Sequence, residues 1–315
     1  MICLSTRSLK MTLSVFVPML VFSLAQSVRG DDYADAVLAD MPTAYYRLGE
    51  AAGATTVANS FGDGEDGTVN AGDGGGVTFG HPGAVGGTDG SAHFNGTGWI
   101  TVLDDNFALD FETGLPFTME YWMNPDGHKD NDANWHIISR SDPATPAADA
   151  FIVNSGTNAN FAENVRFHTD GWGGGNHRVD SGANTVIINE WSHVVGTYNG
   201  SNEMAIYLNG EQVAFEGNID VGPQAPPAGD LFIGTLSTVT AGNDYQGYID
   251  EVALYNGTAL TPERVLAHYE AGFGPPVPIN ERAWSVDGHA LGFASQSISR
   301  KFFSRDHRLR LGNEI

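Results

Sequence analysis

Residues 191–198 read Trp-Ser-His-Val-Val-Gly-Thr-Tyr, a run of β-branched and aromatic residues that favours a β-strand. Residues 204–208, Met-Ala-Ile-Tyr-Leu, follow with the period of two expected when the two faces of a strand differ. Asn209-Gly210 then supplies the two positive φ angles of a type I′ turn, and residues 212–215 return. This part of the chain is therefore predicted to be an antiparallel meander.

The most strongly alternating stretch lies earlier, at residues 117–123, Phe-Thr-Met-Glu-Tyr-Trp-Met. Successive side chains of a strand point to opposite faces, so alternate residues share a face. One face is predicted to enter the core: Phe117, Met119, Tyr121 and Met123. The other is predicted to line the opposite side of the sheet: Thr118, Glu120 and Trp122.

Further strands are expected at spacings typical of a β-sandwich. They are residues 44–48, 91–94, 99–102, 135–139, 151–154, 164–169 and 185–188. Of these, 91–94 and 99–102 are expected to pair as a hairpin. The glycine-rich stretch 62–90 is expected to form turns and surface loops.

Two short helices are expected, one near each end of the mature chain. The first covers residues 33–40 and ends before Pro42. In the second, Thr261 is the expected N-cap with Pro262 in the first helical position, and the helix ends near Gly272. Its inner face is expected to hold Val265, Leu266 and Tyr269.

The first 30 of the 315 residues are expected to be a secretory signal peptide. Arg7 and Lys10 precede an apolar run from residue 11 to 24, and small residues suited to cleavage follow. The single cysteine, Cys3, lies inside this segment, so no disulfide is expected in the mature chain. One domain is then expected over 31–274.

The tail, residues 275–315, is basic and without clear periodicity, and it is expected to be poorly ordered. No membrane insertion is expected after signal cleavage, because no second apolar segment follows. The sequence therefore predicts a protein that is secreted or held at the cell surface.

The formal net charge of −23 restricts the partners of the chain. Nucleic acids require a basic footprint, and this chain would repel phosphates and anionic lipids. Neutral ligands and cations such as Ca²⁺, which prefers carboxylate and carbonyl oxygens, are favoured instead. Adaptation to a salty or extracellular setting is an alternative explanation of the acidity.

Catalytic motifs are not evident. A glycosidase needs two carboxyl groups about 5 to 10 Å apart beside the scissile bond, yet Glu120 is the only carboxylate on the central strand. Asp250 and Glu251 are adjacent and are expected on opposite faces of one strand. Nucleophile-elbow, zinc-protease and phosphate-loop motifs are also absent from the sequence. A binding protein is therefore favoured over an enzyme.

Four separated segments together resemble LamG-like domains, the laminin G-like and concanavalin A-like jelly rolls of secreted bacterial proteins. They are Tyr-Tyr-Arg-Leu-Gly-Glu at 45–50, Phe-Thr-Met-Glu-Tyr-Trp-Met-Asn-Pro at 117–125, the meander at 191–214, and Gly-Tyr-Ile-Asp-Glu-Val-Ala-Leu-Tyr at 247–255. The resemblance implies an all-β fold, a two-sheet antiparallel jelly-roll sandwich with a short C-terminal helix. It covers about residues 33–272.

The resemblance also implies a structural Ca²⁺, because such domains often hold one, sometimes where the first and last strands meet. Asp250 on the last strand is the first candidate ligand, with Asp244 and Glu50 as neighbours. Alternatively, Asp250 accepts hydrogen bonds from backbone N–H groups.

A ligand site is expected on the face of the central strand opposite the core. Glu120 and Trp122 lie there, and the glycine-rich stretch 168–178 could overhang them. Aromatic and hydrogen-bonding side chains on a loop of a rigid sandwich suit ligand binding. The candidates in that stretch are His168, Trp172, His177 and Arg178. Alternatively, the stretch is an ordinary hairpin loop and Trp122 is covered by a second layer.

The sequence thus predicts a secreted, non-catalytic binding module that recognises carbohydrate or glycan, because indoles stack on sugar rings and the acidic body disfavours anions. Two other classes are open: a protein adhesion or assembly domain that binds an extracellular protein, and a glycan-cleaving enzyme.

Overall fold

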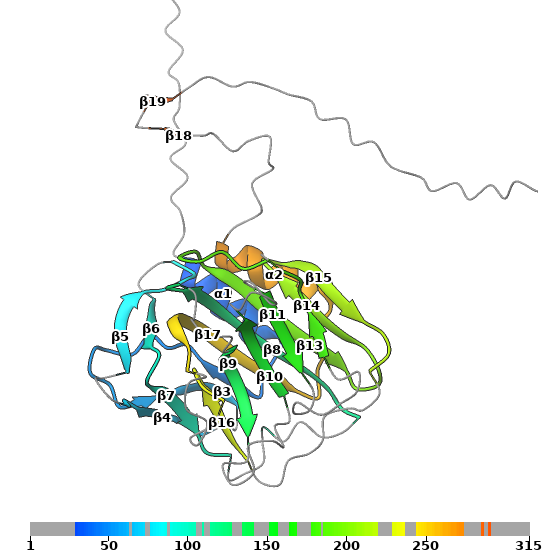
Figure 1. Ribbon diagram of the computed structural model, residues 1–315, viewed down its shortest axis with the longest axis horizontal. Helices are drawn as coiled ribbons and strands as arrows, with labels where there is room; N and C mark the ends of the chain where they lie inside the picture. The colour runs from blue at the N-terminus through cyan, green and yellow to red at the C-terminus, as the bar shows by residue number, and fades with distance from the viewer. Residues whose placement is uncertain are drawn as a thin grey trace, which may run out of the picture.

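Two antiparallel sheets enclose the core in the computed structural model (Figure 1). The structure describes residues 29–62, 65–72, 76–86, 89–104, 109, 114–127, 134–141, 151–156, 164–168, 178–183, 185–219, 229–236, 244–273, 285–286 and 289–290. The predicted two-sheet, all-β jelly-roll fold is confirmed by this arrangement.

The larger sheet has nine strands within the described residues. They are β1 (Ala44–Tyr46), β3 (Asn59–Gly62), β5 (Val77–Pro82), β6 (Gly90–Asn95), β8 (Pro116–Pro125), β13 (Ser192–Asn199), β14 (Met204–Leu208), β15 (Glu211–Glu216) and β17 (Gln246–Asn256). Their order is β15-β14-β13-β8-β17-β1-β3, and β17 also pairs with β6, which pairs with β5.

The smaller sheet has eight strands in the same described part of the chain. They are β2 (Thr56–Val57), β4 (Gly67–Asn70), β7 (Trp99–Val102), β9 (Asn134–Ser141), β10 (Phe151–Gly156), β11 (Asn164–His168), β12 (Arg178–Asp180) and β16 (Asp230–Ile233). The order is β12-β11-β10-β9-β16-β7-β4-β2. A short pair, β18 (Ser285–Val286) and β19 (His289–Ala290), lies in the tail.

Both faces of the central strand β8 behave as its alternation predicts. Phe117, Met119, Tyr121 and Met123 are fully buried in the core between the sheets. The meander is confirmed as well, because β13, β14 and β15 pair in succession, and Asn209 and Gly210 have φ angles of 52° and 80°. Period-two patterns therefore located this half of the sandwich.

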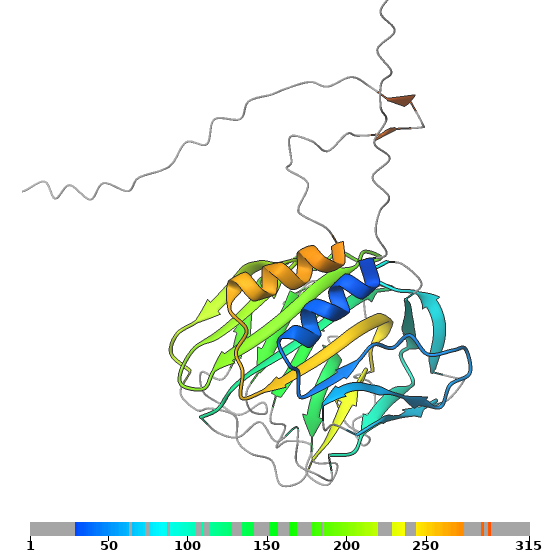
Figure 2. The same ribbon diagram turned by 180° about the vertical axis from the view of Figure 1, so that it is seen from behind.

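Two helices cover the outer face of the nine-stranded sheet: α1 (Arg29–Ala39) and α2 (Pro262–Phe273). Figure 2 shows them side by side across that face, α1 in blue and α2 in orange. Together with residues of the sheet they form a second apolar cluster, which includes Tyr33, Val37, Trp122, Tyr207 and Val265. Within the described residues, neither helix is long and apolar enough to cross a membrane.

Some local predictions were wrong. β6 and β7 belong to different sheets, so they form no hairpin. The glycine-rich region contains β4 and β5, and residues 185–188 form turns rather than a strand. In α2, Leu266 is 36% exposed, whereas His268 is buried in its place. A polar partner beneath the helix explains this exchange, as described below.

We expect Ile206→Ala to lower the free energy of unfolding by about 2 to 5 kcal/mol, because it leaves a cavity in the core. Val213→Ala on β15 is the matched control, since its side chain is 39% exposed, and it should cost about 0.5 kcal/mol or less. Urea unfolding of both variants tests this. Equal losses would mean that the strand faces are assigned wrongly.

Candidate functional site

The predicted sugar platform on β8 lies beneath the two helices. Trp122 is fully buried, with its ring stacked on Tyr269 and Phe273 of α2 at centroid distances of 6.0 and 6.2 Å. Tyr33 of α1 meets it edge-on at 5.9 Å. A sugar can stack only on an exposed aromatic face. The expectation of an open platform at Trp122 is therefore corrected: the helices are the second layer that covers it.

Glu120 is fully buried beside Trp122 and holds this layer to the sheet. Its Oε1 atom accepts hydrogen bonds from Tyr33 Oη at 2.9 Å and His193 Nε2 at 2.8 Å. His268 Nδ1 lies 3.0 Å from both carboxylate oxygens, and Tyr255 Oη donates to Oε2 at 3.2 Å. One carboxylate thus joins α1, α2, β13 and β17.

The charge of Glu120 is balanced by a histidine that is itself held between two carboxylates. His268 Nε2 lies 3.0 Å from Asp40 Oδ2, which also accepts from Arg264 Nε at 2.7 Å. Both ring nitrogens of His268 face carboxylate oxygens, although Nε2 also lies 3.4 Å from Arg264 Nη2, so the two carboxylates favour the cationic imidazole. Burial alone would lower the pKa of His268, but the charges of Glu120 and Asp40 and the hydrogen bond to Glu120 raise it.

Glu120 is held as a carboxylate by the same contacts. Burial alone would raise its pKa, but the charge of His268 and hydrogen bonds from His193 and His268 lower it well below the usual range. A general acid needs access to substrate and a pKa near the working pH. Glu120 meets neither condition, so its place in this structure is to anchor the helices.

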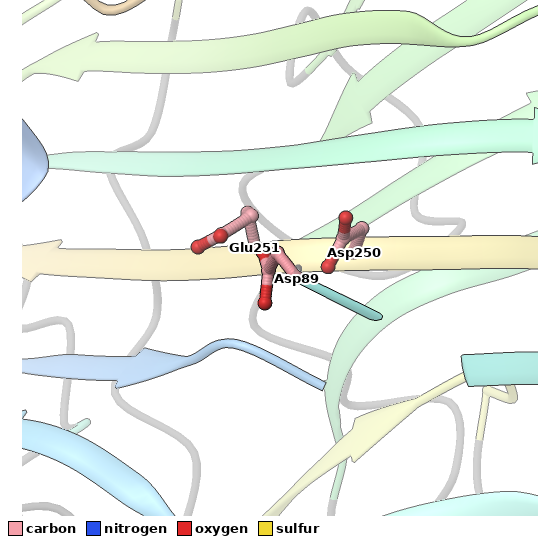
Figure 3. Close-up of side chains that lie close together, drawn as sticks. All are labelled: Asp89, Asp250 and Glu251. Carbon is pink, nitrogen blue, oxygen red and sulfur yellow. The ribbon is translucent and has the colours of Figure 1, made fainter. Parts of the chain in front are cut away.

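A second polar site contains three carboxylates from two segments of the chain. Asp89 precedes β6, whereas Asp250 and Glu251 lie on β17, and the three side chains lie beside each other in Figure 3. Each offers one oxygen, and these oxygens lie within 4.8 Å of one another. Asp250 and Glu251 are both fully buried.

A β-bulge brings the two adjacent carboxylates into one site. Glu251 has a φ of 52°, and the pairing of β17 with β8 shifts between Asp250 and Ala253, so β17 has one extra residue there. The expectation that Asp250 and Glu251 lie on opposite faces was therefore wrong. That expectation assumed a regular strand, in which neighbouring side chains point to opposite faces. The left-handed backbone at Glu251 instead places its side chain on the same face as that of Asp250.

Most oxygens of this cluster have a hydrogen-bond or ion-pair partner among the described residues. Arg47 Nη2 lies 3.1 Å from both Asp89 Oδ2 and Glu251 Oε1, and Tyr45 donates to Glu251 Oε2. Asp250 Oδ2 accepts from the Ala84 N–H at 2.7 Å. Asp250 Oδ1 is buried and has no hydrogen-bond partner among the described residues. Such an oxygen is costly to bury.

The crowded carboxylates raise one another's proton affinity. Burial raises the pKa of Asp250 well above its usual value, and the charge of Asp89 adds to this. Burial, the contact with Asp89 and the charge of Asp250 do the same for Glu251. Three carboxylates against one guanidinium leave a formal charge of −2, so the site favours protons or a cation.

The other two predicted metal ligands lie outside this cluster. Glu50 Oε1 accepts a hydrogen bond from the Ala58 N–H at 3.0 Å. Burial raises the pKa of Glu50, and the nearby charge of Asp89 adds a smaller contribution. The backbone of Asp244 instead forms an isolated parallel β-bridge with His136 of β9, in the other sheet. The structure therefore groups Asp250 with Asp89 and Glu251 and separates it from Asp244.

The predicted loop residues are only partly within the described structure. His168 is 3% exposed on β11, and burial, aided by Arg166, Arg178 and His136, lowers its pKa to about 3. Arg178 on β12 is exposed and lies 3.4 Å from Asp180. Trp172 and His177 lie outside the described residues. Both described residues belong to the eight-stranded sheet, so they do not overhang Glu120 and Trp122.

Residues 94–266, more than half of the chain, match a family described as the concanavalin A-like lectin/glucanases superfamily. The chain belongs to this superfamily. A comparison with curated protein sequences finds no significant match.

Solved structures share the fold of this concanavalin A-like chain at low identity. The binding domain of Paraclostridial Mosquitocidal Protein 1 is 14% identical with a TM-score of 0.54, over 74% of this chain and 53% of that one. A Trypanosoma rangeli sialidase mutant displaying trans-sialidase activity is 15% identical with a TM-score of 0.52, over 74% and 33%. Domain 4 of an extracellular arabinanase from Geobacillus stearothermophilus, in complex with arabinotriose, is 18% identical with a TM-score of 0.49, over 72% and 98%. At these identities, the first two structures show the fold alone.

We expect His268→Gln to destabilise the concanavalin A-like domain most between about pH 4.3 and 6.5, because it removes the cation of the Glu120 network. The pKa of His268 is higher in the folded state than in the unfolded state. Its contribution to the free energy of unfolding is therefore complete below the unfolded-state pKa of about 6.5 and is lost as the pH rises through the folded-state pKa. The pKa of Glu120 is lower in the folded state, so its contribution is complete above the unfolded-state pKa of about 4.3 and is lost as the pH falls through the folded-state pKa.

Urea unfolding across pH 4 to 9 measures this difference, with His81→Gln as a control at a half-exposed histidine. The gap between the wild type and His268→Gln should narrow toward pH 9. A gap that does not change with pH would show that His268 contributes packing only.

Proposed function

We propose that the chain is a secreted, non-catalytic module that binds neutral carbohydrate. The observation that carries the proposal is the state of Glu120: the only carboxylate of the central strand of a lectin/glucanase-type sandwich is sealed under two helices and bonded to four side chains. In this position it supports binding rather than hydrolysis, which needs two accessible carboxyl groups.

The charge of the chain selects among carbohydrates. A net charge of −23 opposes binding of sulfated, phosphorylated or uronate-rich glycans, whereas neutral sugars meet no such barrier. The mosquitocidal-protein neighbour is itself a binding domain. An extracellular protein partner is the second class of ligand, and it is separated from the first by the assay below.

We further propose that Asp89, Asp250 and Glu251 hold a structural Ca²⁺. Two oxygens that each lie about 2.4 Å from one ion can be at most about 4.8 Å apart, and the three carboxylates satisfy this limit. Their formal charge with Arg47 is −2, and the partnerless Asp250 Oδ1 is available as a ligand among the described atoms. A bound ion would fasten the β5–β6 connection, which contains Asp89, to β17.

Excess Ca²⁺ should therefore raise the melting temperature of the wild type, and a chelator should lower it, because an ion that binds only the folded state stabilises it by mass action. Asp250→Asn should abolish the response. In chelator this variant should melt no lower than the wild type, since it removes a buried, repelled charge. Glu211→Gln, at an exposed carboxylate on β15, should respond as the wild type does. Identical wild-type curves in Ca²⁺ and chelator would contradict the site.

On a glycan array, the secreted chain should bind neutral glycans, with little change between 50 and 500 mM NaCl because no ion pairs form with the ligand. No reducing ends should be released from bound polysaccharide. Retention of anionic glycans alone, or steady release of reducing ends, would overturn the proposal. Capture of protein without any glycan would favour the adhesion class.

A further inference from the structure

A row of aromatic and imidazole rings lies on the nine-stranded sheet beyond the helices. His81 of β5, His93 of β6, Tyr248 of β17 and Trp191, just before β13, are all half-buried. Tyr248 contacts each of the other three, with centroid distances of 5.3 Å to His81, 4.6 Å to His93 and 6.2 Å to Trp191. We call these four residues the ring row.

The register of the sheet explains why the ring row is continuous. Tyr248 pairs directly with His93 on one side and with Asn124 of β8 on the other. Since cross-strand partners share a face, the rings stand on the same side of the sheet. Since Tyr248 lies 5.3 Å from His81 and 6.2 Å from Trp191, no two ring centroids of the row are more than about 11.5 Å apart.

Hydrogen-bonding groups accompany the rings. His93 Nε2 lies 2.7 Å from Asp126 Oδ2, and the side chains of both are about one quarter exposed, at 24% and 28%. His81 Nε2 lies 2.9 Å from Thr78 Oγ1, an exposed hydroxyl. The partly exposed rings supply apolar faces. A carboxylate, imidazoles and a hydroxyl at their edge supply oriented polar groups.

These features distinguish the ring row from the buried rings under the helices. Around Trp122 the aromatic faces stack on each other and are closed to solvent. In the ring row the contacts are tilted or edge-on, at interplanar angles of 55° to 75°, and all four residues are half-buried, so part of their surface is accessible. Sugar rings present apolar C–H faces and a rim of hydroxyls, so they match a surface of this kind.

We propose that the ring row is the carbohydrate-binding surface of the chain and that it accepts a neutral oligosaccharide. The sugar faces pack on Trp191 and Tyr248, and Asp126 and the imidazoles bond to hydroxyls. This rests on the proposed function, and it places the ligand on the β5–β6 side of the sheet, next to the carboxylate cluster.

Affinity electrophoresis of the secreted chain in gels containing arabinan, xylan, galactan, β-glucan or starch tests the placement. Trp191→Ala, Tyr248→Ala and His81→Ala should each weaken binding to the retained polysaccharide about tenfold or more. Phe215→Ala is the matched control, because Phe215 is a 54% exposed ring on β15 at the far edge of the same sheet, and it should bind as the wild type does. Melting curves identify any variant that fails to fold.

The outcomes are separable. Failure of the wild type to bind any neutral polysaccharide here and on the array removes the proposed function and the ring row together. Binding by the wild type that persists unchanged in folded Tyr248→Ala and His81→Ala leaves the function intact and overturns the ring row as its site. These two variants keep the test decisive even if Trp191→Ala does not fold, since Trp191 also packs against the helix-covered cluster.

Discussion

The helix layer depends on one buried carboxylate. Glu120 accepts hydrogen bonds from both helices and from two neighbouring strands, and its charge faces the imidazole of His268. Removing one partner of a buried charge pair typically costs about 3 to 5 kcal/mol, because the other charge is left uncompensated. Both helices are therefore fastened to the sheet at the same point. Trp122 lies on this covered face of β8, so its indole packs against the helices although it points away from the core between the sheets.

A second constraint acts on the neighbouring part of the sheet. The two ends of the β5–β6 connection both contact the carboxylate cluster. The Ala84 N–H donates to Asp250 of β17, and Asp89 pairs with Arg47 and lies beside Asp250 and Glu251. The ring row lies on these same strands, so a cation at the cluster would also hold the row in place. In the proposed arrangement, cation binding and sugar binding are coupled through the β5–β6 hairpin, and the helix-covered face is separate from the ligand.

The alternation of residues 117–123 was sufficient to predict both faces of β8, because the pleat fixes them. It could not reveal that the second face is covered, since the covering helices lie near residues 33 and 268, far away in sequence. The carboxylate cluster was predicted only at Asp250, because Glu251 joins it through a left-handed residue that no local pattern announces. The ring row draws on four segments between residues 81 and 248, and only the sheet register brings them together.

The central claim is that the helix-covered face is structural and that ligand binds beside it. Hydrogen–deuterium exchange of the protein, with and without a bound neutral polysaccharide, tests this most directly. The account predicts new protection in peptides covering residues 77–95 and 189–193 and the start of β17, with α1 and α2 unchanged. Protection confined to the two helices, or opening of β8 on binding, would contradict it.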